Sequence, residues 1–167
     1  MKPAGRKAAL KKLYSGSENM TIADIMHTEL ITLDLLARDK EGAIKELIGL
    51  LAKAEIVTNE EGVFKAVMLR ESEFSTGIGM GIAIPHAKCK WVARPAIAFG
   101  RCAESIPWTG EETTYVNLVF LIAVPEEAFN QHMKLIAQIS RKLVHREIRE
   151  RIFDASEAQS VIDVLNE

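Results

Sequence analysis

The apolar run from Leu118 to Val124 places the strongest constraint on how this 167-residue chain can fold. Seven consecutive apolar residues suit a buried strand and fall far short of the roughly 20 residues that a membrane-spanning helix needs. The wider segment, 116–124, is almost continuously apolar instead of alternating with polar residues, which indicates a strand covered on both faces. The sequence therefore predicts a central strand with helices packed against both sides, and no insertion into a membrane.

The segments on either side of this strand carry helix and strand patterns. Asp39 is positioned to cap a helix over 40–54, whose apolar residues follow the i, i+3, i+4, i+7 spacing. Thr58 and Glu61 predict a capping box for a second helix, which would end near Arg70. Further strands are expected at 31–35, 81–84 and 96–99, a helix over 131–145 capped by Asn130, and a last helix capped by Ser156. Helices before and after a central group of strands predict an α/β sandwich.

Composition and charge narrow the class of protein. The length suits one domain with a real core, and the net charge of -2 gives no reason to expect nucleic-acid binding. Residues 1–18 hold five basic residues and one acidic residue, so we expect a basic tail, either a solvated arm or a docking arm for an acidic partner, ahead of a domain over 19–167. Two cysteines, Cys89 and Cys102, are too few for a disulfide scaffold and fit a reducing cytoplasm.

The segment 70–87 contains the clearest candidate for a functional site. Gly77, Gly79 and Gly81 allow the backbone to adopt positive φ and to approach a ligand closely, although a structural turn explains the same pattern. Pro85 lacks an N–H, so the strand should stop there and leave His86 at its end, within reach of solvent. The glycines do not match a dinucleotide or P-loop motif, and no metal-ligand spacing is present.

Three side chains near this segment have both a functional and a structural interpretation. His86 suits a group that takes up and releases a phosphoryl group, but a capping or surface imidazole has the same sequence appearance. His132 falls on the apolar stripe of the helix over 131–145 and also in its first turn, where anions are favoured. Arg70 at a helix end either complements the helix dipole or faces the site.

The run from Arg70 to His86, including Ser75-Thr76-Gly77-Ile78-Gly79 and Gly81-Ile82-Ala83-Ile84-Pro85-His86, resembles a family signature. It is similar to the fructose/mannitol-type EIIA domains of the bacterial phosphoenolpyruvate-dependent phosphotransferase system, which include the nitrogen-regulatory EIIA proteins. The likeness extends over about 20–165, and the segment 132–137 resembles the family's second histidine motif. Met80 departs from the polar residue or glycine that many members carry.

The resemblance implies a mixed sheet sandwiched by helices and a phosphotransferase component with a phosphohistidine intermediate. His86 would accept the phosphoryl group from the carrier HPr or its nitrogen-branch relative, with Arg70 offsetting charge and His132 bonding the phosphate. The residues implied to cradle the phosphate are Thr76, Gly77, Gly79 and Gly81.

No cofactor, metal or nucleic acid is implied, and the protein would be cytoplasmic. The nitrogen-type regulatory branch is our first hypothesis. A sugar EIIA that passes the group to EIIB, and a binding module without transfer, are the alternatives.

A carrier that docks beside His86 would need an apolar contact surface with charged residues at its rim. The residues nearest in sequence predict that Ile78, Met80 and Trp91 supply the apolar contact. Glu71 and Glu73 are the expected rim charges for a basic partner.

Overall fold

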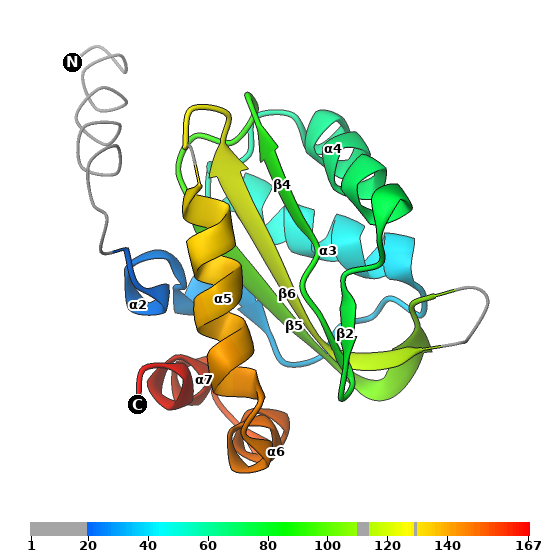
Figure 1. Cartoon of the computed structure of the whole chain (residues 1–167), viewed down its shortest axis with the longest axis vertical. Coiled ribbons are helices and arrows are strands. Elements are labelled where there is room, and N and C mark those ends of the chain that lie inside the picture. Colours follow the sequence, from blue (N-terminus) through cyan, green and yellow to red (C-terminus); the bar gives the residue numbers. More distant parts are fainter. Residues whose placement is uncertain (1–19, 110–113, 129) are drawn as a thin grey trace.

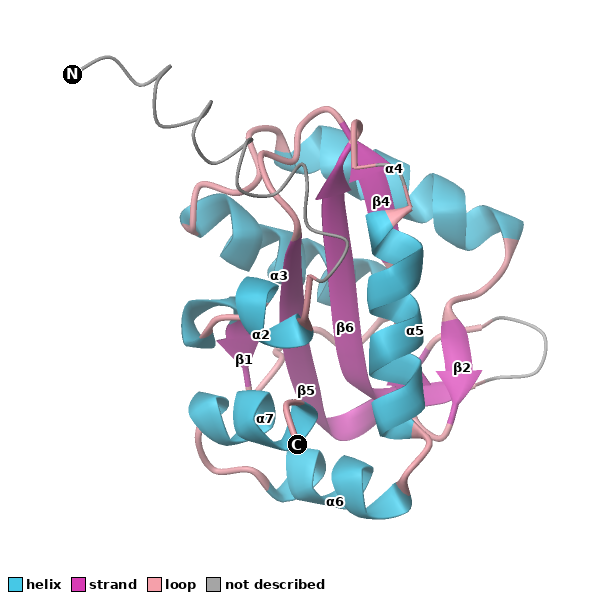
Figure 2. Ribbon diagram, turned by 60° about the vertical axis from the view of Figure 1, so that its left-hand side comes forward, coloured by secondary structure: helices cyan, strands magenta, loops and turns pink. Residues whose placement is uncertain are grey.

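The computed structural model describes residues 20–109, 114–128 and 130–167; the predicted basic tail, 1–18, lies outside the described residues. Helices pack on both faces of one sheet (Figures 1 and 2). The strands are β1 (Ile31–Thr32), β2 (Gly77–Gly79), β3 (Ile82–Ala83), β4 (His86–Cys89), β5 (Ala96–Pro107) and β6 (Tyr115–Pro125). The helices are α2 (Ile22–Ile25), the 3-10 turn η1 (Thr28–Leu30), α3 (Lys40–Lys53), α4 (Glu60–Glu73), α5 (Gln131–Leu143), α6 (Arg146–Asp154) and α7 (Ala158–Leu165).

Strand β6 lies at the centre of the sheet, as its apolar run predicts. The strand order is β1-β5-β6-β3-β2, and β4 also pairs with β6. β6 is antiparallel to β5 on one side and parallel to β3 and then β4 on the other. The sheet is therefore mixed, and the prediction of an α/β fold with a mixed sheet sandwiched by helices is confirmed.

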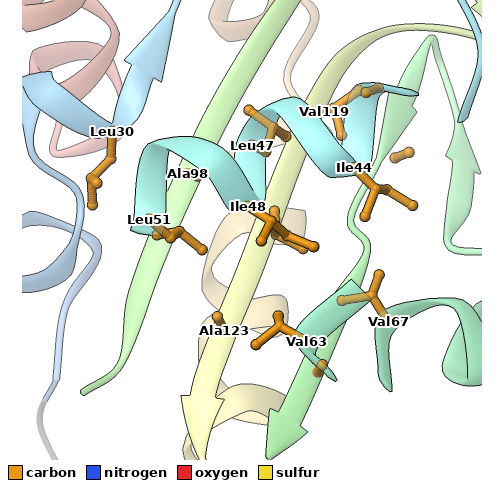
Figure 3. Close-up of a cluster of buried hydrophobic side chains, with 14 of the residues drawn as sticks. Leu30, Ile44, Leu47, Ile48, Leu51, Val63, Val67, Ala98, Val119 and Ala123 are labelled. Atoms are coloured by element: carbon orange, nitrogen blue, oxygen red, sulfur yellow. The ribbon is translucent and has the colours of Figure 1, made fainter. Parts of the chain in front are cut away.

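Alternate side chains along β6 point into two separate hydrophobic cores. Val119, Leu121 and Ala123 point to the face covered by α3 and α4, where they pack with apolar residues such as Ile48 and Val63 (Figure 3). The residues between them belong to the second core, under α2, α5, α6 and α7. In that second core the rings of Phe99 and Phe120 lie 4.7 Å apart. A strand with apolar residues on both faces is what two covering layers of helices require.

The helix starts follow the sequence in one case and differ from it in others. Asp39 caps α3 by accepting a hydrogen bond from the Gly42 N–H at 2.7 Å. The cap of α4 is Asn59, one residue beyond the predicted Thr58, because the Thr58 N–H and hydroxyl both donate to the Trp91 carbonyl. At α5, Asn130 precedes the helix but its side chain makes no capping hydrogen bond.

The remaining boundaries also shift. Strand β1 covers two residues instead of the predicted five, and β5 continues to Pro107, well past the predicted end at 99. α7 starts after Glu157 instead of after Ser156. Within the ranges that the structure describes, we find no helix with the length and apolar character to cross a membrane.

Candidate functional site

His86 begins a strand, whereas the sequence predicted that it would end one. β3 stops at Ala83, and the chain resumes pairing with β6 at His86, which lies opposite Ile122. Pro85 does break the ladder by lacking an N–H, but its carbonyl accepts a hydrogen bond from the Ile122 N–H at 3.0 Å. The chain therefore continues to pair with β6 after Pro85. His86 is buried, with only 8% of its surface exposed.

The hydrogen bond of the His86 ring fixes its tautomer. Nδ1 lies 2.9 Å from the carbonyl oxygen of Ile84. Because a carbonyl only accepts hydrogen bonds, Nδ1 carries the proton and the neutral ring leaves the lone pair on Nε2. His86 therefore presents Nε2 as a nucleophile without first losing a proton from that atom.

Burial lowers the pKa of His86 below its ordinary value, and the positive charge of Arg70 lowers it further. The hydrogen bond to Ile84 and the Glu71 carboxylate act in the opposite direction on this pKa without reversing it. The ring is therefore predominantly neutral at neutral pH, the form that a nucleophilic imidazole needs.

His132 lies next to His86 in space, although the two are 46 positions apart. It occupies the first turn of α5, and its ring centroid is 6.0 Å from that of His86, with the ring planes tilted by 35°. His132 is half-buried, at the exposed end of the stripe formed by Leu135, Ile139 and Leu143. The position of His132 is thus consistent with both interpretations: its side chain lies at the edge of the core, and it also lies beside His86.

Arg70 comes from the other helix layer. It lies in the last turn of α4, is half-buried, and its Nη1 donates to the carbonyl of Phe74 at 3.0 Å. That bond secures the end of the helix, and the charge is close enough to influence the pKa of His86. The structure therefore brings Arg70, His86 and His132 together from α4, β4 and α5.

The glycine-rich segment forms a hairpin whose turn lies away from His86. Gly79, Met80 and Gly81 have φ values of 84°, 59° and 76°. These left-handed residues link β2 to β3, as a tight turn requires. The turn lies beyond Ile82, and the register places Ile82 and His86 four positions apart along β6, about 13 Å at 3.3 Å per residue. The structural-turn interpretation thus accounts for Gly79 and Gly81, whose turn the strand register places away from the histidine.

Thr76 and Gly77 are closer to His86, but Thr76 has other partners. The N–H of Thr76 donates to the carboxylate of Glu71 at 3.2 Å, and its hydroxyl donates to the same carboxylate. Its two donors are therefore engaged within the protein, and a role for Thr76 in cradling a phosphate stays a prediction. Gly77 packs against Trp108, since an added Cβ would lie 3.1 Å from the indole Cδ1.

Two of the residues expected on the docking surface lie elsewhere. Glu71, expected as an exposed rim charge, is buried with 6% exposure. A signal for this was present in the sequence, because Glu71 follows Val63 and Val67 at intervals of four on the buried stripe of α4. Trp91 lies past the far end of β4 and packs against Gly62, where an added Cβ would come within 2.5 Å of the ring.

Phe74, which follows α4, and Met133, which follows His132, are exposed apolar side chains close in sequence to Arg70 and His132. They are 78% and 56% exposed, respectively. Ile78 and Met80 are also exposed but belong to the hairpin. Phe74 and Met133 are therefore available as apolar contacts beside the ends of α4 and α5 that carry Arg70 and His132, whereas Trp91 packs against Gly62.

Metal ligation and thiol chemistry are the other reactions that histidine and cysteine side chains could support. Among the described residues, no group of three or more His, Cys, Asp or Glu side chains is arranged to hold a metal ion. Cys89 and Cys102 are both buried free thiols. Burial raises the pKa of Cys102 to about 11 and also raises that of Cys89, so both stay protonated.

Comparison with known proteins gives consistent matches over nearly the whole chain. Residues 24–167 match the family described as phosphoenolpyruvate-dependent sugar phosphotransferase system, EIIA 2. The chain is 38% identical to the fructose-specific EIIA component of Haloferax volcanii over 87% of its own length and 95% of that protein. It is 36% identical to the fructose-specific EIIABC component of Bacillus subtilis over 89% of its own length, but spans only 23% of that longer protein.

The fold is similar to the crystal structure of the nitrogen regulatory protein IIA-Ntr from Neisseria meningitidis, with a TM-score of 0.79 and 30% identity over 86% of this chain and 98% of that one. The sequence match and the fold agree with the resemblance carried by the segment around His86. The chain therefore belongs to the EIIA 2 family of the phosphoenolpyruvate-dependent sugar phosphotransferase system.

Proposed function

We propose that His86 accepts a phosphoryl group from an HPr-like phosphocarrier and later passes it to another protein. The observation that carries the proposal is the hydrogen bond from Nδ1 to the Ile84 carbonyl, which leaves the Nε2 lone pair free in a neutral ring. In the transfer, Nε2 forms a bond to phosphorus while the bond from phosphorus to the donor imidazole breaks. The electron pair of the broken bond returns to the donor nitrogen, so no proton has to move at Nε2.

Arg70 and His132 assist by charge and hydrogen bonding. Phosphoryl transfer needs position and electrostatic stabilisation more than covalent chemistry from the protein. A phosphoryl group on His86 would lie near the Arg70 guanidinium, whose charge already lowers the pKa of His86. With its ring 6.0 Å away, His132 is close enough to donate a hydrogen bond to a phosphoryl oxygen. The carrier would contact Phe74 and Met133, exposed apolar residues that lie close in sequence to Arg70 and His132.

The nitrogen-type regulatory branch remains our first choice for the biological role. The TM-score of 0.79 with IIA-Ntr supports it. Sugar uptake through an EIIB domain is the second candidate, because the chain is 38% identical to a fructose-specific EIIA component. The same step at His86 serves both branches, which work in the reducing cytoplasm that buried free thiols suit.

A transfer assay with purified components tests the proposal. The protein is incubated with phosphoenolpyruvate, enzyme I and either HPr or its nitrogen-branch relative, and the acid-labile phosphate is measured. We expect labelling of the parent and of His145→Ala, since His145 is an exposed histidine directly before α6, and none of His86→Ala. Faster labelling by the nitrogen-branch carrier favours regulation, and transfer onward to a fructose EIIB favours sugar uptake. If the folded parent takes no label from either carrier, the protein is a binding module instead.

A further inference from the structure

Glu71 is a buried carboxylate that the transfer step described above does not use. Its side chain is only 2% exposed, and it lies in the last turn of α4 between Lys40 and Thr76. The Lys40 Nζ is 3.4 Å from Glu71 Oε2, and Lys40 is the first residue of α3. Burying a charged group costs free energy unless the group is paired and hydrogen-bonded, and Glu71 has both kinds of partner.

A short chain of hydrogen bonds connects this carboxylate to the His86 ring. Glu71 accepts from the N–H and hydroxyl of Thr76. The Thr76 carbonyl accepts from the Ile84 N–H at 3.0 Å, and the Ile84 carbonyl accepts from His86 Nδ1 at 2.9 Å. Three hydrogen bonds, relayed through Thr76 and Ile84, therefore connect the Glu71 carboxylate to the His86 imidazole.

The middle link matters because Ile84 lies between two strands. β3 ends at Ala83 and β4 begins at His86, so Ile84 has no partner in the ladder with β6. The Ile84 N–H donates to the Thr76 carbonyl on the side of β2, and the Pro85 carbonyl accepts from the Ile122 N–H on the side of β6. Without an anchored Thr76, the Ile84 carbonyl loses one of the two constraints that aim it at the ring.

We propose that Glu71 is a positioning residue for His86: by anchoring Thr76 it aims the Ile84 carbonyl that keeps the proton on Nδ1 and the lone pair on Nε2. The consequence for transfer rests on the proposed function, whereas the tautomer is a property of the unphosphorylated protein. A purely structural role for Glu71 would stabilise the end of α4 and leave the His86 tautomer unchanged.

The tautomer can be measured directly by long-range ¹H–¹⁵N NMR of the full chain labelled at histidine. The variants are Glu71→Gln, which keeps the shape and removes the charge, and the matched control Glu73→Gln, the same change at an exposed position on α4. We expect parent and Glu73→Gln to show His86 with its proton on Nδ1 alone. In Glu71→Gln the signals should move toward a mixture of both tautomers.

The pKa of His86, read in the same titration, gives a second measurement. The charged or titratable groups that face the ring are Arg70 and Glu71 from α4 and His132 from α5. The Glu71 carboxylate raises the pKa of His86, so Glu71→Gln should lower it further while Glu73→Gln leaves it unchanged. A folded Glu71→Gln protein with the parent tautomer and pKa overturns the proposal.

A second pair of variants covers the case in which Glu71→Gln fails to fold. Thr76→Val keeps the side-chain shape but loses the hydroxyl that donates to Glu71, and Thr76→Ser retains it. We expect a smaller shift toward mixed tautomers in Thr76→Val, and recovery of the parent signals in Thr76→Ser. Identical His86 signals in the two variants overturn the proposal.

Transfer assays then distinguish a failure of the proposed function from a failure of the role proposed for Glu71. Loss of an outer partner that orients a metal-ligating side chain typically costs about 10–100-fold, and by analogy we expect a fall of that order in the rate of His86 phosphorylation in Glu71→Gln. If the parent itself takes no phosphoryl group, the proposed function fails while the tautomer result still decides the role of Glu71. If the tautomer of Glu71→Gln shifts and transfer from the carrier is unchanged, Glu71 does not position His86 for the reaction.

Discussion

At the scale of single residues, the state of His86 depends on its burial and on contacts made in the folded chain. The Ile84 carbonyl selects the tautomer, burial lowers the pKa, and Arg70 adds to that effect. None of these conditions could be predicted from the Pro85-His86 pair itself, because they depend on the packing of α4 and on the register of β4 against β6. The sequence did locate the reactive segment, since glycine, proline and histidine constrain the backbone locally.

The lowered pKa of His86 predicts how stability depends on pH. Its folded-state pKa lies below the ordinary 6.5, so between these values the unfolded chain binds more protons than the folded one. This contribution is fully present above pH 6.5 and is lost as the pH falls toward the folded-state pKa. His86→Gln lacks this pH-dependent contribution to stability, so its free energy of unfolding should fall less steeply below pH 6.5 than that of the parent. Denaturant titrations at several pH values test this, and equal slopes would contradict the assigned pKa direction.

Arg70 should affect transfer more than folding. Its Nη1 bond to the Phe74 carbonyl is at a half-exposed helix end, so Arg70→Ala should leave the melting temperature nearly unchanged. Removing one donor that stabilises transition-state charge commonly lowers the rate by about 10²–10³. Stopped-time labelling with a fixed carrier concentration measures this, and Lys65→Ala on the same helix is the control. A parent-like rate in Arg70→Ala would remove the guanidinium from the site.

At the scale of helices and strands, local patterns predicted the elements better than their junctions. The cap of α3 and the central strand followed from short-range patterns, whereas the cap of α4 shifted because Thr58 bonds to Trp91, 33 positions away. The break between β3 and β4 was similarly beyond local inference, because the Pro85 carbonyl pairs with Ile122 across the sheet. Junctions that depend on such distant partners carry no local sequence signal.

Arg101 is a structural residue that sequence reasoning missed. From β5 it donates to the carbonyl of Leu33 at 3.1 Å, and to those of Ile152, Phe153 and Ala155 at the end of α6. Arg101→Ala would leave part of these carbonyls without a partner, which costs about 1–3 kcal/mol when the group is buried. We expect a melting temperature several degrees lower by calorimetry, while Arg151→Ala, which loses only an exposed pair with Glu167, melts like the parent. Equal melting temperatures for all three proteins would show that these bonds do not hold α6.

The two glycines of the hairpin turn should differ in their tolerance of a side chain. Both have positive φ, which costs an L-residue roughly 1–2 kcal/mol. An added Cβ at Gly79 meets open space, but at Gly81 it would lie 2.7 Å from Asn117 Oδ1. Thermal unfolding should therefore rank Gly81→Ala below Gly79→Ala in stability.

The Gly79→Ala variant also tests whether the turn takes part in transfer. Because the turn lies beyond Ile82, which is itself about 13 Å from His86 along the strand, folded Gly79→Ala should be phosphorylated at the parent rate. A strongly reduced rate in a stably folded variant would indicate that the turn contacts the phosphoryl group or the carrier. The predicted order of stability of Gly79→Ala and Gly81→Ala does not depend on that result.

At the scale of the whole molecule, the candidate site lies where the two helix layers meet beside one edge of the sheet. α4 belongs to the layer over one core and α5 to the layer over the other, and each contributes a residue next to His86. The sequence predicted both layers from the central strand, but it could not show that the end of α4 and the start of α5 converge on β4. That convergence follows from the parallel pairing of β4 with β6, which is set by contacts between distant segments.

The most direct test of this account is the position of the phosphate on the phosphorylated protein. ³¹P and ¹⁵N NMR of the histidine-labelled chain, after reaction with phosphoenolpyruvate, enzyme I and the carrier, identifies both the residue and the ring nitrogen. The account predicts a phosphoryl group on Nε2 of His86, because Nδ1 is held as a donor to Ile84. A phosphoryl group on Nδ1 of His86, or on His132, would contradict it.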